Sequence, residues 1–399
     1  MDFATLRRAG HAPSLLAALL YFDVSFMAWV LLGALGAYIG DELGLSASAK
    51  GLMVAVPLLS AAFFRVALGL LGDRYGPRRV GLLSMSVVVL ALLAGWLGAN
   101  SYGALIGVGV LLGVAGASFA VALPLASRHY PPRHQGLAMG IAGAGNSGTV
   151  LTTLAAPRIA EHLGWHAVFG LALIPVTLVW VAFALLAKEP PKPAVPAPLT
   201  DLRNVLREAD AWRLCGLYAV TFGTFVGLAS FLPIFFHDQY GISKVDAATI
   251  VAVGAGLGSL LRPLGGYLGD RGGGTTVLTG AFGMGAALLL FASALPALAA
   301  AAIAFPIVMA VFGVGNGAVF QLVGLRYGDR IGMLTGLVGA AGGLGGFFLP
   351  TILGGTRDLF GSYGPGIGAI AAAAAIALCG TLVARRPLQA RLAPAGARV

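Results

Sequence analysis

The stretch RVALGLLGDRYG (residues 65–76) recurs in the second half of the chain as RPLGGYLGDRGG (residues 262–273). In both copies an arginine is followed eight residues later by the aspartate of a GDR turn, and the copies lie 197 residues apart. Tyr21 and Tyr218 keep the same offset. Repetition at one spacing indicates two copies of a structural unit. The sequence therefore predicts two equivalent halves.

The composition places these halves in a membrane. Of the 399 residues, 58% are hydrophobic and 10% are charged, and the mean hydropathy is +0.90. A soluble chain carries about 25% charged residues. The chain has no metal-ligand, phosphate-loop or nucleophile-elbow pattern, so we expect no enzyme activity, no metal and no cofactor.

Apolar runs of about 20 residues, long enough to cross a hydrocarbon core of about 30 Å, recur from end to end. Because lipid offers no hydrogen-bond partners to backbone amides, each run should be a helix. The predicted fold class is an all-α polytopic membrane protein with twelve spans. They lie near residues 14–39, 50–71, 80–99, 102–127, 135–159, 165–187, 211–236, 247–268, 275–295, 298–325, 331–354 and 364–384.

The longest hydrophilic connection covers residues 188–210 and includes the proline-rich run EPPKPAVPAP. Such a run cannot be helical throughout and is typical of a linker. It divides the chain into an N-terminal six-helix bundle (1–187) and a C-terminal six-helix bundle (211–399).

The distribution of basic residues predicts the orientation. The net charge is +10. With the N-terminus in the cytoplasm, Lys50, Arg158, Lys244 and Arg357 lie outside, Arg65 and Arg262 lie in mid-span, and every other Lys and Arg is cytoplasmic. This bias predicts an inner-membrane protein with both termini in the cytoplasm. Since the basic surplus is an orientation signal, nucleic acid is not an expected partner.

Three ionisable residues fall deep in predicted spans: Asp23, Arg65 and Arg262. Each costs about 2.5–3.5 kcal/mol to insert, so each needs a function. In a two-half protein the two arginines should face one central cavity, where their repulsion favours an anion between them. A planar guanidinium suits a flat oxyanion such as nitrate, nitrite or a carboxylate. The alternative is an arginine paired with Asp23, which can satisfy only one of the two.

The turn GDRYGPRR (72–79) resembles the loop between the second and third helices of the major facilitator superfamily, where it is a cytoplasmic gating clasp. The resemblance and the repeat assign gating to Asp73, Arg74, Asp270 and Arg271. The alternative is an ordinary basic cytoplasmic turn.

Two glycine-rich segments resemble the nitrate signatures of the nitrate/nitrite porters, a family within that superfamily. They read GLAMGIAGAGNSGTV (136–150) and GLVGAAGGLGGFFLP (336–350). Glycine spacing alone would indicate only close helix packing. Further similar segments are YFDVSFMAWVLLGALG (21–36), GVAGASFAVALP (113–124), YAVTFGTFVG (218–227) and GVGNGAVFQL (313–322), so the resemblance covers nearly the whole chain.

The resemblance implies a substrate site. It assigns the anion to Arg65 and Arg262, because the family holds its anion between paired arginines. Aromatic faces can sandwich a flat anion, and Tyr and Asn supply neutral donors. The other implied site residues are Asn146, Tyr218, Phe119, Phe222 and Phe320, with Phe26 and Gln321 as further candidates. Taken singly, each aromatic could instead belong to the core.

Asp23 breaks the symmetry of the halves, since its counterpart at the offset of 197 is Val220. The segment YFDVSFM resembles the branch of the family thought to be proton-coupled. We therefore expect import of nitrate, and also of nitrite, by proton symport with alternating access. The expected partners are nitrate or nitrite, a proton and membrane lipid, and the expected state is a monomer. The alternatives are nitrate/nitrite antiport, with Asp23 purely structural, and an anion sensor that does not transport.

Overall fold

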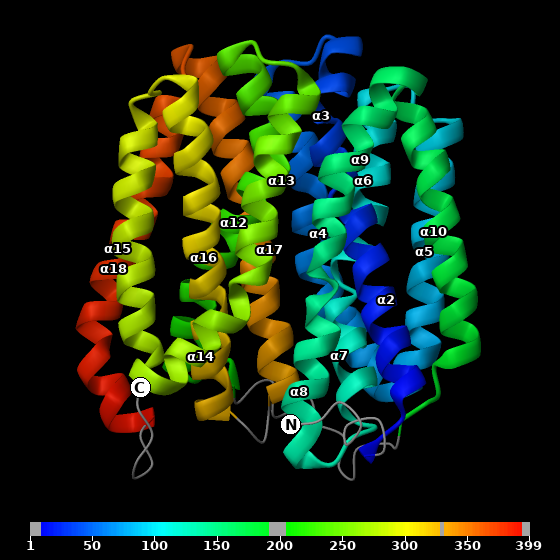
Figure 1. Ribbon diagram of the computed structural model, residues 1–399, viewed down its shortest axis with the longest axis vertical. Helices are drawn as coiled ribbons and strands as arrows, with labels where there is room; N and C mark the ends of the chain where they lie inside the picture. The colour runs from blue at the N-terminus through cyan, green and yellow to red at the C-terminus, as the bar shows by residue number, and fades with distance from the viewer. Residues whose placement is uncertain (1–8, 191–204, 328–330, 393–399) are drawn as a thin grey trace. The chain divides into compact units, whose positions relative to one another are not determined.

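The computed structural model describes residues 9–190, 205–327 and 331–392. Within these ranges the regular elements are helices and no strand occurs, so the predicted all-α fold class is confirmed. The helices labelled in Figure 1, with the 3-10 helix η1, are α2 (Ala12–Trp29), α3 (Leu31–Glu42), α4 (Ala47–Tyr75), α5 (Pro77–Leu97), α6 (Tyr102–Gly116), α7 (Phe119–Ser127), α8 (Pro132–Gly143), η1 (Ala144–Ser147), α9 (Gly148–Leu163), α10 (Trp165–Leu186), α12 (Ala209–Tyr240), α13 (Lys244–Leu260), α14 (Arg262–Gly272), α15 (Gly274–Ser293), α16 (Leu298–Tyr327), α17 (Ile331–Phe360) and α18 (Gly364–Leu392).

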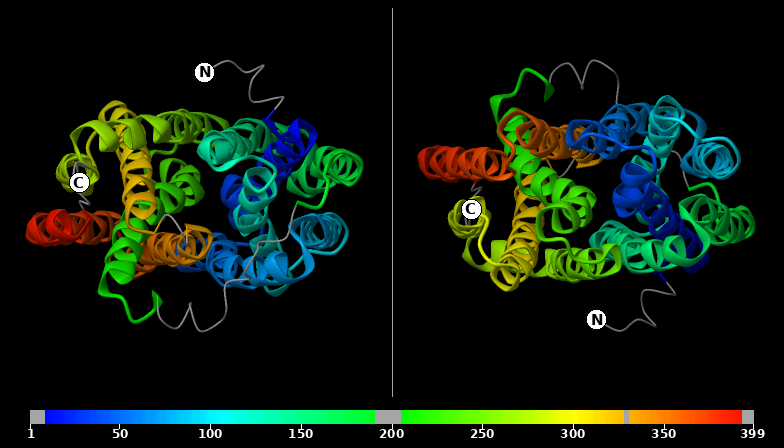
Figure 2. Two further views of the ribbon diagram at one scale, coloured as in Figure 1. Left: turned by 90° about the horizontal axis from the view of Figure 1, so that it is seen from below. Right: turned by 90° about the horizontal axis from the view of Figure 1, so that it is seen from above.

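By its internal contacts the chain divides into two units. Unit 1 comprises Met1–Leu35 and Val56–Leu202, and unit 2 comprises Gly36–Ala55 and Arg203–Val399. In unit 1, α2 packs against α7, α9 and α10, and α5 packs against α6 and α10. In unit 2, α12 packs along α17 and α16, and α15 packs against α16 and α18. The end-on views of Figure 2 look down most of these helices, as expected for spans that run side by side within each unit.

Residues 36–55, which we call the crossover segment, hold the end of α3 and the start of α4 and belong to unit 2. The carboxylate of Asp358 in α17 accepts hydrogen bonds from the backbone N–H groups of Ala47 (3.1 Å) and Ser48 (2.8 Å). An acidic side chain at a helix N-terminus satisfies orphan N–H groups and complements the helix dipole. Gly354 allows α17 to approach closely, because a Cβ there would lie 2.3 Å from the carbonyl oxygen of Ala47.

Within the described residues, eleven helices are long and apolar enough to cross a membrane. The fifth of the twelve predicted spans is not among them. Residues 135–159 form α8, η1 and α9, so this predicted span is helical but is interrupted by a 3-10 turn. The run AGNS forms the 3-10 helix that interrupts it. Glycine and short polar side chains weaken the α-helix, which explains the position of the break.

Other predicted spans also contain breaks. Val30 separates α2 from α3, Ala117 and Ser118 separate α6 from α7, and Leu261 separates α13 from α14. At the break after α6 the backbone pairing changes, because the N–H of Ala120 bonds to the carbonyl of Ala117, three residues earlier, at 3.0 Å. Three of the predicted site residues, Phe119, Asn146 and Arg262, lie in or directly beside such breaks.

The repeat has a counterpart in backbone conformation. The six described glycines with positive φ form three pairs, each at the offset of 197: Gly44 (+59°) with Gly241 (+66°), Gly76 (+95°) with Gly273 (+90°), and Gly164 (+78°) with Gly361 (+68°). Only glycine adopts these angles readily. The two halves therefore turn with the same backbone conformation at the same places.

Candidate anion site and ion-pair network

Arg65 lies within α4 and is buried, with 3% of its surface exposed. Its Nε–H donates to the carbonyl oxygen of Gly116 at 3.0 Å. Its guanidinium carbon lies 5.4 Å from the ring centre of Trp29, within cation–π range. The first predicted anion ligand is therefore held by groups from α2 and α6.

Asp23 lies on α2 and is half-buried. The hydroxyl of Ser147 donates to its carboxylate at 2.6 Å. Across the part of the chain that the structure describes, Asp23 makes no ion pair, so the alternative of a fixed pair with an arginine gains no support.

The glycine-rich segments bring backbone onto backbone beside the predicted site. A Cβ on Gly148 would lie 2.0 Å from the carbonyl oxygen of Asp23, and a Cβ on Gly145 would lie 2.8 Å from the amide nitrogen of Asp23. In unit 2, a Cβ on Gly345 would lie 2.0 Å from the carbonyl oxygen of Ala219. No other residue fits at such an approach. Both halves thus use glycine to seat one broken or glycine-rich helix on another.

The remaining unit 1 candidates gather around α2. Phe26 meets Trp29 edge-on, with ring centres 4.8 Å apart, and Phe22 edge-on at 4.4 Å. The Phe119 ring centre lies 5.7 Å from that of Phe22. Asn146 sits in η1, is 6% exposed, and its Oδ1 has no hydrogen-bond partner among the described residues. A buried amide oxygen without a partner is costly, so Asn146 is suited to a ligand or water.

In unit 2, four predicted residues come together. Arg262 opens α14, and its Nη2 donates to the hydroxyl of Tyr218 at 3.1 Å. Its guanidinium carbon lies 5.2 Å from the ring centre of Phe320. Tyr218 stacks on Phe222 with ring centres 5.0 Å apart and planes 6° apart, and it meets Phe320 edge-on at 5.1 Å. This is a half-buried guanidinium flanked by a phenol and aromatic faces.

Gln321 lies elsewhere. Cβ atoms on Gly269 and Gly274 would approach its side chain to 3.2 Å and 2.4 Å, so the amide packs against the second GDR turn. Its Oε1 has no partner among the described residues. The structure therefore does not group Gln321 with Arg262.

The four predicted gating residues differ between the halves. Asp73 forms an ion pair with Arg128, and Arg74 lies over the ring of Tyr75 at 5.3 Å. Arg271 lies over the ring of Tyr267 at 4.5 Å, and Asp270 is exposed. Only the first GDR turn joins its aspartate to an arginine within the described residues.

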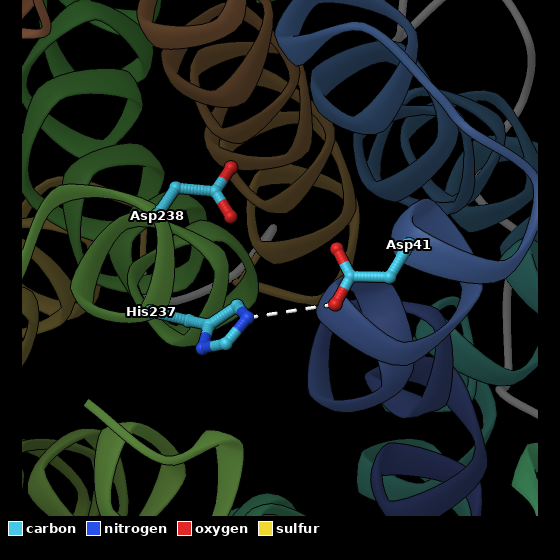
Figure 3. A group of neighbouring side chains, drawn as sticks. All are labelled: Asp41, His237 and Asp238. Carbon is cyan, nitrogen blue, oxygen red and sulfur yellow. Dashed lines mark ion pairs between the residues drawn. The ribbon is translucent and has the colours of Figure 1, made fainter. Parts of the chain in front are cut away.

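An ion-pair network lies within unit 2, at the ends of α3 and α12 and the starts of α4 and α13. Lys50 Nζ lies 3.0 Å from the Asp238 carboxylate and 3.7 Å from that of Asp41. Lys244 Nζ lies 2.6 Å from Asp41, and His237 Nε2 lies 3.5 Å from it, as Figure 3 shows for the imidazole. The network ties the crossover segment to the rest of unit 2.

Asp41, His237 and Asp238 place their possible ligand atoms within 4.8 Å of one another, which is close enough for a cation site (Figure 3). However, the ammonium groups of Lys50 and Lys244 already balance the two carboxylates. A metal ion would have to displace them, so the arrangement favours an ion-pair network. Burial and the neighbouring Asp238, to which its hydroxyl donates at 3.3 Å, raise the pKa of Tyr363.

Sequence reasoning missed Trp29, Phe22 and Ser147. A helical pattern could have found the first two, because Phe22, Phe26 and Trp29 recur at spacings of four and three on one face of a helix. The contact of Ser147 with Asp23 depends on the break at η1, for which the hydropathy pattern gives no signal.

Residues 17–350 match the Major Facilitator Superfamily. The chain is 36% identical to the "Probable nitrate/nitrite transporter NarK2" of Mycobacterium tuberculosis over 390 residues, covering 95% of this chain and 98% of the relative. It is 33% identical to the "Probable nitrate/nitrite antiporter NarK1" of Thermus thermophilus over 370 residues, covering 84% and 82%. A solved bacterial homologue of the human lysosomal transporter Spinster superposes with a TM-score of 0.73 at 21% identity, covering 96% and 99%. The chain is thus a multi-pass membrane protein that belongs to the nitrate/nitrite porter family of the Major Facilitator Superfamily.

Proposed function

We propose that the protein imports nitrate, and also nitrite, across the inner membrane by proton symport. Alternating access of the bundles 1–187 and 211–399, joined by residues 188–210, would expose one anion site to each side in turn. Both termini would be cytoplasmic and the protein would act as a monomer. No covalent chemistry is involved.

The observation that carries the anion site is the environment of Arg262. Tyr218 accepts a hydrogen bond from one edge of the guanidinium, the ring of Phe320 lies against it, and Phe222 stacks on Tyr218 behind it. Apolar walls strengthen the attraction between a cation and a small anion and exclude larger hydrated ones. Arg65 supplies the equivalent charge in the other half, at the offset of 197 residues. Nitrate fits this chemistry, and the names of the relatives point the same way.

Asp23 supports proton coupling. A carboxylate in a span that makes no ion pair with a described residue can gain and lose a proton without breaking one. In the proposed cycle its negative charge offsets an arginine while the site is empty. A proton and the anion then bind together, and both are released inside.

The test is uptake of labelled nitrate by proteoliposomes while internal pH is recorded. Symport predicts internal acidification that follows nitrate entry and accumulation driven by an inward proton gradient. Antiport, which the name of the Thermus thermophilus relative favours, predicts nitrate entry only against internal nitrite and no response to a pH gradient. Anion binding without any flux would indicate a sensor.

A further inference from the structure

The two arginines of the proposed site are supported differently. The Nε of Arg65 bonds a backbone carbonyl and its guanidinium lies over an indole, whereas the Nη2 of Arg262 bonds a phenol hydroxyl. A phenol hydroxyl moves whenever its side chain changes rotamer, whereas a backbone carbonyl moves only with its helix. This contrast identifies groups in unit 1 that fix the direction of Arg65.

The carbonyl that receives Arg65 is made available by a helix break. In an unbroken helix the N–H of Ala120 would bond to Gly116, four residues earlier. Here it bonds to Ala117 at 3.0 Å, because α6 ends at Gly116. Arg65 Nε–H donates to the carbonyl of Gly116 at 3.0 Å. The break in the fourth span thus creates an acceptor inside the protein for Arg65.

Trp29 is the second group that contacts the Arg65 guanidinium. Its Nε1–H donates to the carbonyl of Pro57 at 2.9 Å, and the residue is 1% exposed. A Cβ on Gly116 would lie 2.3 Å from the indole, so only glycine leaves room for the ring. The indole is therefore fixed by α4, wedged against the end of α6, and lies 5.4 Å from the Arg65 guanidinium carbon.

We infer that Trp29 and Gly116 are positioning residues that fix the Arg65 guanidinium in the direction the anion site requires. Trp29 would act through the cation–π contact, and Gly116 through its carbonyl and its missing side chain. The inference rests on the proposed anion-binding role of Arg65. It adds a residue type, tryptophan, to the arginines, phenylalanines, tyrosine and asparagine of the predicted site.

The test compares Trp29→Leu with Trp29→Phe and Gly116→Ala in nitrate uptake by proteoliposomes. Trp29→Leu removes the aromatic face and should raise KM about three- to thirtyfold, the range of a desolvated cation–π contact, with kcat nearly unchanged. Trp29→Phe keeps a face and should recover most of the loss. Gly116→Ala displaces the indole and should resemble Trp29→Leu. An unchanged KM in Trp29→Leu, or equal losses in the Leu and Phe variants, would overturn the inference.

Trp165→Leu is the matched control, because Trp165 is 2% exposed in the same unit, stacks on His166 and meets Phe169 edge-on. It should change thermal stability without raising KM. An equal rise of KM in Trp165→Leu would mean that any lost tryptophan in unit 1 has this effect, and the inference would fail.

A double-mutant cycle separates this inference from the proposed function. Thermal unfolding in detergent is measured for Trp29→Leu, Arg65→Leu and the double variant. Non-additive losses of stability would show that Trp29 and Arg65 interact, which supports the positioning role of Trp29. Unchanged nitrate binding in Arg65→Leu would instead contradict the proposed anion site. Additive losses of stability would refute the positioning role of Trp29 and would not affect the proposed anion site.

Discussion

At the scale of single residues, the two arginines should tolerate no exchange for lysine. A lysine at position 65 cannot both bond the Gly116 carbonyl and present a planar fork, and a lysine at 262 loses the geometry with Tyr218. We expect each variant to weaken nitrate binding at least about tenfold, equivalent to about 1.4 kcal/mol. Isothermal titration in detergent measures this. The control is Arg158→Lys, at an exposed site on α9, and wild-type affinity in both test variants would exclude the arginine site.

Asp23 should decide coupling and not affinity. Asp23→Asn resembles the protonated acid and removes the titrating charge, so the variant should bind and exchange nitrate but neither accumulate it nor carry protons. The measurement is nitrate-driven proton uptake in proteoliposomes. Asp246→Asn, at an exposed carboxylate on α13, serves as the control. Proton uptake at the wild-type rate in Asp23→Asn would place coupling elsewhere.

At the scale of helices, the close contacts of Gly148 and Gly345 predict that neither position tolerates a side chain. An added Cβ would lie 2.0 Å from a carbonyl oxygen of the neighbouring helix at each position, so the helices must separate. Gly148→Ala and Gly345→Ala should each cost about 1–3 kcal/mol of stability, the range for overpacking, and should reduce transport. Gly143→Ala and Gly336→Ala are matched controls on the same segments, because nothing lies within 4 Å of an added Cβ there. The measurement is the melting temperature in detergent, and equal values for all four variants would contradict this prediction.

At the scale of helices, the sequence predicts the spans and the repeated arginines but not the helix breaks. Hydropathy finds spans, and the 197-residue repeat finds Arg65 and Arg262, because both signals are carried by residue type and spacing. Helix breaks have a weaker signal: the 3-10 turn at 144–147 and the turn at Ala117 and Ser118 contain glycine or short polar residues, but residues of these types also occur inside unbroken spans. The contacts of Ser147 and Gly116 depend on those breaks. The family resemblance predicted that Tyr218, Phe222 and Phe320 lie near Arg262. It did not predict the cation–π contact between Arg65 and Trp29.

At the scale of the molecule, the ion-pair network should stabilise the attachment of the crossover segment to unit 2. The side chains of Lys50 and Asp238 are 9% and 19% exposed, so removing one partner leaves the other charge buried. We expect Lys50→Met or Asp238→Asn alone to cost about 3–5 kcal/mol, and the double variant to recover part of this loss. Thermal unfolding in detergent checks the expectation. Additive losses in the double variant would show that the pair contributes nothing.

The crossover segment also has a consequence for biosynthesis. Lys50 emerges from the ribosome long before its partner Asp238, which follows 188 residues later. At about 5–20 residues per second, this interval is about 10–40 s. Throughout it, the remainder of unit 1 can be completed from residues already translated, while residues 36–55 have none of their final neighbours in α12 and α17. Until Asp238 is translated, Asp41 is the carboxylate of the network that is available to Lys50, because it lies in the same crossover segment and precedes Lys50 in the chain.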